Sequence, residues 1–349
     1  MTNLRNLSQE QLEQLMQDLG EPKFRAKQVY EWVWEKFAAD IQDMTNLSKS
    51  LREKLAQDYF IPKVQVHHSQ FSSDGTIKSR LQLHDGNYVE SVLIPTEQRM
   101  TVCVSSQVGC SLSCKFCATG FMDRKRNLEF DEIVDQVTLT AQLAQTHHSR
   151  NLTNIVFMGM GEPLLNYKNL LMAVERITSP DGLHMSPRRI TVSTAGISKM
   201  IKQLGDDKVR FKLALSLHAA TDAKRNEIMP INETNNIKSL IEALNYFYEM
   251  TGNEITFEYI LFKNFNDSLK DAEDLVKIYR QVPADLINII EYNPIDNARF
   301  AKPDEKVTEE FMAYLESKRV NARLRRSRGK DIDAACGQLA NVDQSRRPA

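Results

Sequence analysis

Three cysteines lie within one short polar loop of the sequence, Cys110-Ser-Leu-Ser-Cys114-Lys-Phe-Cys117. Thiolates this close in sequence can converge on one soft metal centre. An iron–sulfur cube is normally held by four cysteines, so three protein ligands leave one iron open. That open iron can bind the amino and carboxylate groups of S-adenosylmethionine (SAM), and an electron from the cube then yields a 5′-deoxyadenosyl radical. The spacing therefore predicts a 4Fe–4S cluster that supports radical chemistry.

Two other interpretations of the three cysteines stay open: a structural zinc site, or three buried free thiols. Zinc sites usually use CxxC pairs with a fourth ligand nearby. The closest downstream histidines, His147 and His148, lie well beyond zinc-finger spacing. We therefore favour the cluster. The motif, with Phe116 directly before the last cysteine, also resembles the signature of the radical SAM superfamily.

The composition is that of a globular protein. The 349 residues are 42% hydrophobic and 26% charged, and no apolar run approaches the roughly 18 residues of a membrane span. The polar start, Met1-Thr-Asn-Leu-Arg5, does not resemble a signal peptide. Five cysteines, three of them clustered, fit a reducing compartment better than a disulfide framework. We expect a cytoplasmic enzyme with no membrane association.

The formal net charge of −1 offers no general attraction for a polyanion, so any nucleic-acid surface must be local. Two basic clusters could provide one. Residues 124–126 are Arg-Lys-Arg, and residues 318–330 contain seven basic residues and no acid. Such clusters suit phosphate contacts. A charge run is also often just a solvated face, and the sequence leaves that alternative open.

Residues 1–60 predict a helical accessory domain. Ser8 and Gln11 form a capping box, and apolar residues then recur at helical spacing. A second helix is expected from about Phe24, and a third over 47–55. The unit could dock RNA, or it could be a packing appendage.

Residues 61–97 change to an alternating pattern that is typical of strands. The dipeptide Asp74-Gly75 and the tripeptide Asp85-Gly86-Asn87 are hairpin turn signals. A small antiparallel hairpin sheet is therefore expected before the main domain. Glu90 interrupts its apolar last strand, and by itself it indicates the solvent face of an edge strand.

From residue 98 to residue 349 the pattern is strand then helix, repeated. Six strands are expected, at about 101–105, 154–159, 189–194, 212–218, 254–261 and 286–293. Such alternation predicts a parallel sheet covered by helices. Six units are fewer than the eight of a closed barrel. We therefore expect an α/β fold with an open (βα)6 partial barrel, an active site at the carboxyl ends of its strands, and a further strand near 323–326.

Polar and glycine residues follow several of these strands and would meet at that end of the barrel. They are Gly159-Met-Gly161-Glu162-Pro163, Ser193-Thr-Ala-Gly196, Ser216-Leu217-His218 and Asn293-Pro294. Glycine lets the backbone approach a ligand closely, and small polar groups suit a ribose, a carboxylate or an adenine edge. Each segment alone could be a plain turn, and His218 alone a structural histidine. Their recurrence favours a cofactor site.

Cys103 and Cys336 lie outside the cysteine loop. Two unrelated buried thiols would be the ordinary interpretation. Cys336, however, is followed by Gly337 in a loop beyond a basic strand, where access and nearby positive charge would favour its thiolate.

Together these motifs resemble the RlmN/Cfr family of radical SAM RNA methyltransferases, from the helical start to Cys336 and with no departure at a motif position. The resemblance implies methylation of carbon-2 of an adenosine in the peptidyl-transferase centre of 23S rRNA, and of the adenosine 3′ of the anticodon in tRNAs. It implies a 4Fe–4S cluster on Cys110, Cys114 and Cys117 with SAM on the open iron. It also implies a reducing electron donor such as flavodoxin or ferredoxin, and we expect a monomer. The implied SAM contacts are Gly161, Glu162, Ser193, Ser216, Leu217, His218 and Asn293.

The resemblance also assigns catalytic roles to Cys336, Cys103 and Glu90. Adenine carbon-2 has no lone pair with which to attack a sulfonium methyl, so a radical route is needed. In the family mechanism Cys336 becomes S-methylcysteine at the expense of one SAM, and a second SAM activates that methyl for addition to an extruded base. Cys103 then releases the product by forming a disulfide with Cys336. Glu90 matches the proton acceptor, which replaces the edge-strand interpretation.

Two alternative functions stay open. A Cfr-type enzyme of the same family has the same five cysteines but methylates carbon-8 of the rRNA adenosine; Pro163 and the stretch Leu93-Ile-Pro95 favour the carbon-2 enzyme. A non-catalytic iron–sulfur or zinc protein that binds RNA would cleave no SAM, and would give Cys103 and Cys336 no role.

Overall fold

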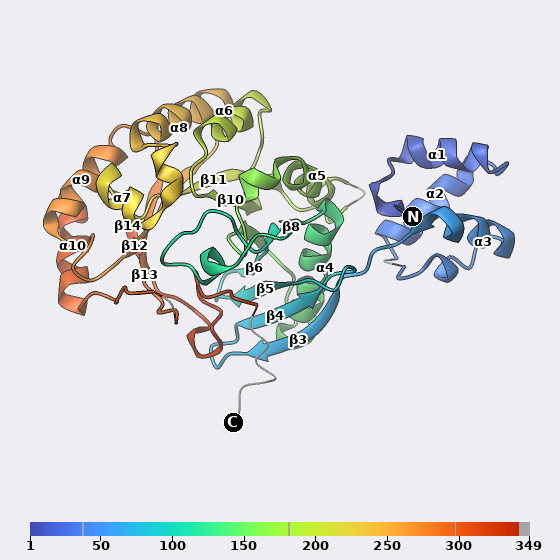
Figure 1. Ribbon diagram of the computed structural model, residues 1–349, viewed down its shortest axis with the longest axis horizontal. Coiled ribbons are helices and arrows are strands. Elements are labelled where there is room, and N and C mark those ends of the chain that lie inside the picture. Colours follow the sequence, from blue (N-terminus) through green and yellow to red (C-terminus); the bar gives the residue numbers. More distant parts are fainter. Residues whose placement is uncertain (37, 181, 297, 342–349) are drawn as a thin grey trace.

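The computed structural model describes residues 1–36, 38–180, 182–296 and 298–341. One sheet of ten strands organises this part of the chain, and helices cover its outer side (Figure 1). A separate group of helices, formed by the N-terminal residues, lies beside it (Figure 1). Within the described ranges, no helix has the length and apolar character needed to cross a membrane.

Seven neighbouring strands of the sheet run parallel in the described part of the chain. In spatial order they are β14 (Ala322–Arg325), β13 (Leu286–Glu291), β12 (Ile255–Leu261), β11 (Lys212–Ser216), β10 (Ile190–Thr194), β9 (Asn154–Phe157) and β6 (Met100–Cys103). The six predicted strands are confirmed, and β14 is the further strand expected near 323–326. Strand β11 ends two residues earlier than predicted, because His218 has a φ of +53°, which no strand residue adopts.

Helices follow the parallel strands along the chain, as the strand–helix pattern predicts. They are α4 (Phe130–His148), α5 (Tyr167–Thr178), α6 (Ser198–Asp206), α7 (Asp222–Ile228), α8 (Ile237–Thr251), α9 (Leu269–Tyr279) and α10 (Glu305–Ser317). Local sequence sets their ends. For example, the Asn236 side chain accepts the N–H of Ser239 at 2.9 Å to start α8, and Gly252, with a φ of +63°, ends it. Strand β12 is buried along its whole length beneath these helices.

The predicted hairpin strands are present and extend the main sheet. They are β3 (Gln65–Phe71), β4 (Ile77–Gln82) and β5 (Tyr88–Pro95), all antiparallel, and β5 also pairs antiparallel with β6. Gly75 and Gly86 occupy their turns with φ of +85° and +79°, as the turn signals indicate. Because β5 lies between β4 and β6, it is an interior strand.

The N-terminal helices are α1 (Gln9–Asp18), α2 (Phe24–Trp34) and α3 (Lys49–Asp58), and the predicted Ser8–Gln11 capping box is formed. Strands β1 (Thr2–Asn3) and β2 (Tyr59–Phe60) pair to close this unit. Arg5 connects it to the barrel: the guanidinium donates to both carboxylate oxygens of Asp135 in α4, at 2.8 and 2.7 Å. The RNA-docking role of this unit stays a prediction.

The remaining elements are short. Strands β7 (Gln107–Val108) and β8 (Arg126–Asn127) pair antiparallel at the base of the cysteine loop. Single turns of 3-10 helix lie at Leu4–Asn6, Ile41–Asp43, Ala118–Phe121, Pro163–Asn166, Pro187–Arg189, Pro230–Glu233 and Lys330–Ile332.

Candidate active site

A cavity of about 870 Å³ lies at the carboxyl ends of the parallel strands, beside the cysteine loop. Its walls combine the cysteine loop, the segments that follow β9, β10 and β11, and the C-terminal segment that carries Cys336. The predicted site residues that line it are Cys110, Cys114, Cys117, Gly161, Glu162, Ser193, Ser216, His218 and Cys336. We call it the cofactor cavity.

The cysteine loop is folded tightly against its own backbone. A Cβ atom on Gly120 would lie 2.5 Å from the carbonyl oxygen of Cys114, so only glycine fits there. At the base of the loop, a Cβ on Gly109 would lie 2.1 Å from the carbonyl oxygen of Asp123, and its φ is +77°. These two glycines bring the loop back on itself and turn its three cysteines toward one cavity.

The three thiols fit a thiolate-ligated cluster. Burial raises the pKa of Cys110 to about 11, and burial together with the charges of Cys117 and Cys110 raises the pKa of Cys114 well above its usual value. All three thiols line the cofactor cavity, and a bound metal would displace their protons. Among the described residues, no three His, Cys, Asp or Glu side chains are grouped closely enough for a single ion. A four-iron cube is wider, and each cysteine binds a separate iron, so soft donors spaced more widely suit it.

Glu162 joins the ends of β9 and β10 at the cavity wall. Its Oε1 accepts the N–H of Leu164 at 3.0 Å, and its Oε2 accepts the N–H of Ala195 at 2.7 Å. Burial raises the pKa of this carboxyl, while the N–H groups of Ala195 and Leu164 act in the opposite direction. Gly161, with a φ of +93°, precedes it, and a Cβ there would lie 2.5 Å from the side chain of Gln107. The carboxylate is therefore held in one place.

Ser193 and Ser216 meet at the ends of β10 and β11, where their hydroxyl oxygens are 3.2 Å apart. His218 follows in the same wall, and its Nδ1 accepts the N–H of Ile260 at 3.1 Å. Burial, and then the charge of Arg225, lower the pKa of His218 to about 3. The imidazole is therefore neutral, with its proton on Nε2. Its ring packs edge-on against Phe116 of the cysteine loop, 4.8 Å between centroids.

Leu217 and Asn293 do not line the cofactor cavity. The Leu217 side chain is in the core, its N–H donates to the carbonyl of Glu258, and its carbonyl accepts from Nε of Arg225. The Nδ2 of Asn293 donates to Oγ of Ser327 at 2.9 Å and to the carbonyl oxygen of Cys336 at 3.4 Å. Asn293 therefore supports the Cys336 loop.

The C-terminal segment packs directly on the cysteine loop. The carbonyl of Gly337 accepts the N–H of Ala118 at 2.7 Å, and the carbonyl of Leu339 accepts from Oγ1 of Thr119 at 2.6 Å. These bonds place Cys336 beside the cluster cysteines, although the two segments are far apart in sequence. All five cysteines of the chain are free thiols in this structure.

Cys103 is buried on β6 near Cys336 and Arg325. Burial, and then the charge of Cys336, raise the pKa of Cys103 to about 12, and Arg325 acts in the opposite direction. The charge of Cys336 is in turn the largest cause that raises the pKa of Arg325. The structure thus brings the two predicted catalytic cysteines together around one guanidinium, which the sequence reasoning did not identify.

Glu90 lies on β5, outside the walls of the cofactor cavity, and the residue is only 2% exposed. The edge-strand interpretation is therefore wrong, because β5 is an interior strand. Its Oε2 accepts the N–H groups of Ala340 and Asn341, both at 3.0 Å, and its Oε1 lies 3.4 Å from Nζ of Lys78. Glu90 holds the end of the C-terminal segment in this structure.

Two further residues of the site were missed in the sequence. Glu258, in the middle of β12, lines the cavity and accepts from Nδ2 of Asn288 at 2.6 Å. A glutamate within the apolar run Ile255–Leu261 was an available signal. Arg225 in α7 is completely buried and donates to the carbonyl oxygens of Ala195, Ser216 and Leu217. It ties together the ends of β10 and β11, but in sequence it looks like an ordinary charged helix residue.

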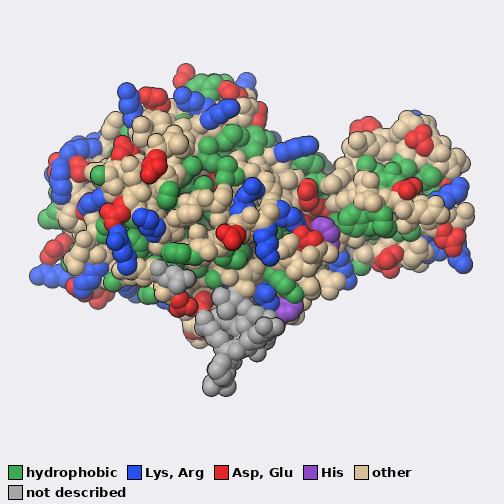
Figure 2. All heavy atoms as spheres, viewed as in Figure 1, with side chains coloured by type: hydrophobic (Ala, Val, Ile, Leu, Met, Phe, Trp, Pro, Cys, Tyr) green, Lys and Arg blue, Asp and Glu red, His purple; other side chains and the backbone are tan. Residues whose placement is uncertain are grey.

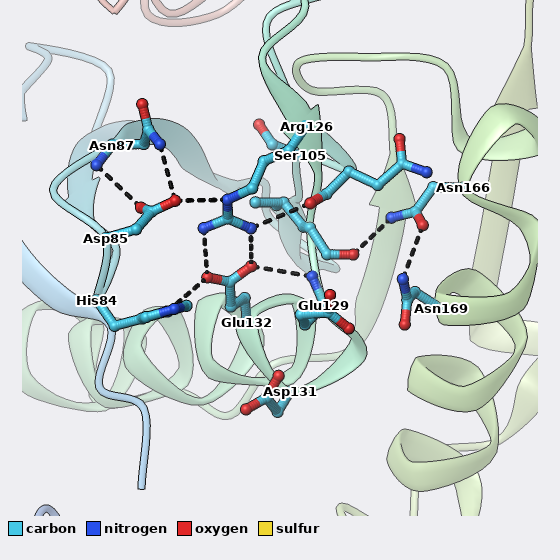
Figure 3. Close-up of polar contacts among 12 residues, drawn as sticks. His84, Asp85, Asn87, Ser105, Arg126, Glu129, Asp131, Glu132, Asn166 and Asn169 are labelled. Atoms are coloured by element: carbon cyan, nitrogen blue, oxygen red, sulfur yellow. Dashed lines mark hydrogen bonds and ion pairs between the residues drawn. The ribbon is translucent and has the colours of Figure 1, made fainter. Parts of the chain in front are cut away.

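The basic residues after the cysteine loop are engaged within the protein. Figure 3 shows Arg126 between Glu132 of α4 and Asp85 of the β4–β5 turn. Its guanidinium donates to Oδ2 of Asp85 at 2.6 Å and to the two carboxylate oxygens of Glu132 at 2.7 and 2.8 Å. The guanidinium holds β8 against α4 and is not free for phosphate. On the face drawn in Figure 2, basic and acidic side chains are interspersed, as expected from a net charge of −1.

Comparison with known proteins gives consistent similarities. The model of the ribosomal RNA large subunit methyltransferase N-terminal domain matches residues 2–61, and the radical SAM superfamily model matches residues 104–277. A probable dual-specificity RNA methyltransferase RlmN from Cytophaga hutchinsonii is 56% identical over 97% of this chain and 92% of its own length. The dual-specificity RNA methyltransferase RlmN of Anaeromyxobacter dehalogenans is 44% identical over 97% of this chain and 91% of its own.

One solved structure is similar over almost the whole chain. The crystal structure of a radical SAM methyltransferase from Sphaerobacter thermophilus superposes with a TM-score of 0.90 at 39% identity, covering 98% of this chain and 100% of that one. This similarity confirms the predicted radical SAM α/β fold.

Proposed function

The chain belongs to the RlmN family of dual-specificity RNA methyltransferases within the radical SAM superfamily, and from that membership we propose that it methylates carbon-2 of adenosine in 23S rRNA and tRNA. It is an RNA methyltransferase whose cofactors are a 4Fe–4S cluster and SAM. The proposed targets are an adenosine of the peptidyl-transferase centre and the adenosine 3′ of the anticodon. Flavodoxin or ferredoxin is the proposed electron donor.

One observation carries the proposal: Cys336 lines the same cavity as Cys110, Cys114 and Cys117. The three loop cysteines would hold the cluster, and Gly161, Glu162, Ser193, Ser216 and His218 face the space where SAM would bind. Leu217 and Asn293 would act indirectly, through the strand end and the Cys336 loop. When bound, the cluster and SAM supply the methyl group and the radical that removes hydrogen from an unreactive carbon.

Cys336 is the proposed methyl carrier. Its Sγ attacks the methyl carbon of one SAM, the bond from that carbon to the sulfonium sulfur breaks, and S-adenosylhomocysteine leaves. Arg325 lines the same cavity as this thiol and brings a positive charge to it. The carbon atom is then transferred from Cys336 to carbon-2 of the base, with a second SAM consumed.

Cys103 and Glu90 complete the proposed cycle. Sγ of Cys103 attacks Sγ of Cys336, a disulfide forms, and the bond between that sulfur and the transferred carbon breaks. The proximity of the two thiols supports this step. Glu90 accepts the carbon-2 proton. Because its carboxylate is occupied by the N–H groups of Ala340 and Asn341, that role requires the end of the C-terminal segment to move away first.

Mass spectrometry of product RNA tests the proposal. The protein is reconstituted anaerobically with iron and sulfide, reduced, and incubated with SAM and either a 23S rRNA fragment or tRNA. We expect 2-methyladenosine in the digested RNA and a methyl group on Cys336 when RNA is omitted. The appearance of 8-methyladenosine would assign the Cfr-type reaction. The absence of any methylated adenosine, with Cys336 unmodified, would contradict the proposal.

A further inference from the structure

A second hollow lies inside the curved sheet and is larger than the cofactor cavity, at about 2660 Å³. Alternate residues of the parallel strands point into it, including Thr256, Glu258, Asn288 and Ile290. Arg99 and Arg189 directly precede β6 and β10, and both line it. The hollow therefore reaches the amino ends of the strands, away from the cysteine loop.

This hollow is strongly basic, and we call it the basic groove. In the described part of the chain, three acidic side chains line it, Glu97, Glu254 and Glu258. Its nine basic side chains are Arg99, Arg188, Arg189, Arg210, Lys212, Arg323, Arg325, Arg326 and Arg328. The walls of the cofactor cavity, by contrast, contain one Arg or Lys side chain among the described residues, that of Arg325. A protein with a net charge of −1 thus concentrates positive charge around this groove.

Most of these cations are not neutralised. Among the described residues, only Lys212 and Arg325 of the nine form ion pairs, with Glu254 and Glu258. Burial, and then repulsion by Arg325 and Arg99, lower the pKa of Arg323. Neighbouring cations repel one another, and an anion bound between them relieves that repulsion. Such a cluster is therefore expected where an anion binds. The seven basic residues within 318–330 contribute four of the lining arginines, at positions 323, 325, 326 and 328.

The basic groove and the cofactor cavity share a wall. Five residues line both: Met158, Glu258, Ile290, Arg325 and Cys336. Cys336 can therefore be reached from either side. On the groove side, Met158 and Ile290 offer an apolar surface beside it, which suits the face of a base better than a phosphate.

We propose that a single-stranded RNA loop enters through the basic groove, at the amino ends of the strands, and presents its target base to Cys336 from the side opposite SAM. This inference rests on the proposed function, and it adds the route by which the substrate enters. Backbone phosphates contact the arginines near the strand starts, while one unstacked base reaches the shared wall. Cys336 then accepts its methyl group on one side and delivers it on the other, so SAM and RNA never compete for one space.

The first test measures RNA binding by the triple variant R188A/R189A/R210A. This variant removes three arginine side chains at the outer end of the groove. All three are exposed and lie far from the cysteine loop in sequence. A fluorescent anticodon stem–loop is titrated at several salt concentrations. Each phosphate contact to a single strand contributes about 0.7 to the steepness of log K against log salt, where K is the association constant. Three lost contacts should therefore make this plot shallower by about 2, and should weaken binding roughly ten-fold or more.

The matched control is K199A/K202A/R280A, which removes three exposed cations from the outer helices α6 and α9 and their ends. The control should bind RNA like the wild type, and thermal unfolding should verify that both variants fold. If the groove variant binds as tightly as the control while the wild type methylates RNA, the groove route is wrong and the proposed function stands. If the wild type neither binds nor methylates RNA, both fail.

A crosslinking experiment needs no variant. RNA carrying 4-thiouridine next to the target adenosine is irradiated with the wild-type protein, and crosslinked peptides are identified by mass spectrometry. Crosslinks to residues 96–101, 188–191 or 251–254, all in or beside the groove wall, are expected. Crosslinks confined to residues 109–125 of the cysteine loop would place RNA entry on the opposite side and overturn the proposal.

Discussion

Nη1 of Arg325 lies 3.6 Å from Oε2 of Glu258, in the wall shared by the cofactor cavity and the basic groove. Burial raises the pKa of Glu258, and Arg325 is the largest cause acting in the opposite direction. The guanidinium also lies near Cys336 and Cys103, whose charges raise its own pKa. One cation thus links a buried carboxylate to the two cysteines of the proposed cycle.

Arg325→Gln should slow alkylation of Cys336. Arg325 and Cys336 line the same cavity, so the positive charge of the guanidinium lies close to the negative charge that the reacting sulfur carries. We expect the rate of reaction with iodoacetamide at pH 7.5 to fall about ten-fold, which corresponds to ~1.4 kcal/mol of lost charge stabilisation. The measurement is mass spectrometry of the C-terminal peptide over time, in protein without cluster.

Glu258→Gln is the matched control for that experiment, because it removes the opposite charge from the same ion pair. Cys336 should then react as fast as in the wild type or faster, since Arg325 loses its competing carboxylate. Equal slowing in both variants would mean that the ion pair acts through packing and not through charge.

Cys103→Ala should trap RNA on the protein. Without the resolving thiol, the carbon between Cys336 and the base has no sulfur nucleophile to release it. A reconstituted variant should therefore give a band of protein covalently joined to tRNA on a denaturing gel. The double variant Cys103→Ala/Cys336→Ala should give none. A single variant that turns over normally and leaves no crosslinked band would remove Cys103 from the mechanism.

The sequence was most informative where chemistry depends on residues close together in the chain. Three cysteines within one loop, and small polar residues after successive strands, could be recognised because parallel strands place their carboxyl ends at one edge. The structure brings Cys110, Glu162, Ser193 and His218 to a single cavity, as that reasoning predicts.

Contacts between distant segments could not be predicted in the same way. Arg225 is in sequence a charged residue on a short helix, yet it is buried among carbonyl oxygens of two strand ends. Glu90 looked solvent-facing because periodicity does not show that β5 has a neighbour on each side. The basic groove likewise exists only because segments far apart in sequence bring their arginines to one hollow.

His218→Asn should remove part of the acid sensitivity of the fold. Burial and Arg225 lower the pKa of His218 to about 3, from an ordinary 6.5, so between those values the unfolded state binds a proton that the folded state does not. The contribution of His218 to the free energy of unfolding is therefore fully present above pH 6.5. It is lost as the pH drops toward 3, by up to ~1.4 kcal/mol per pH unit. Asn can still accept the N–H of Ile260. Urea unfolding of both proteins at pH 7 and pH 5 should show a smaller loss for the variant, and equal losses would contradict the neutral, buried imidazole.

Arg5→Ala should loosen the N-terminal helices from the barrel. The Arg5 side chain is 4% exposed, pairs with Asp135, and lies over Trp34 with its guanidinium carbon 4.6 Å from the ring centroid. Its removal leaves the buried carboxylate of Asp131 and the partly buried carboxylate of Asp135 uncompensated, at a cost of about 3–5 kcal/mol. Burial already raises the pKa of Asp131 to about 6 despite the charge of Arg5, so the variant should lose more stability at pH 8 than at pH 5, where that carboxyl can bind a proton.

Limited proteolysis measures this loosening, because trypsin should release residues 1–60 from the Arg5→Ala variant well before it cuts the wild type. The double variant Arg5→Met/Asp135→Leu replaces the ion pair by apolar side chains and should recover part of the resistance. If Arg5→Ala resisted trypsin as the wild type does, the ion pair would not be what holds the helices in place. Their position would then depend on the contact of Trp34 with Phe130, whose ring centroids are 5.7 Å apart.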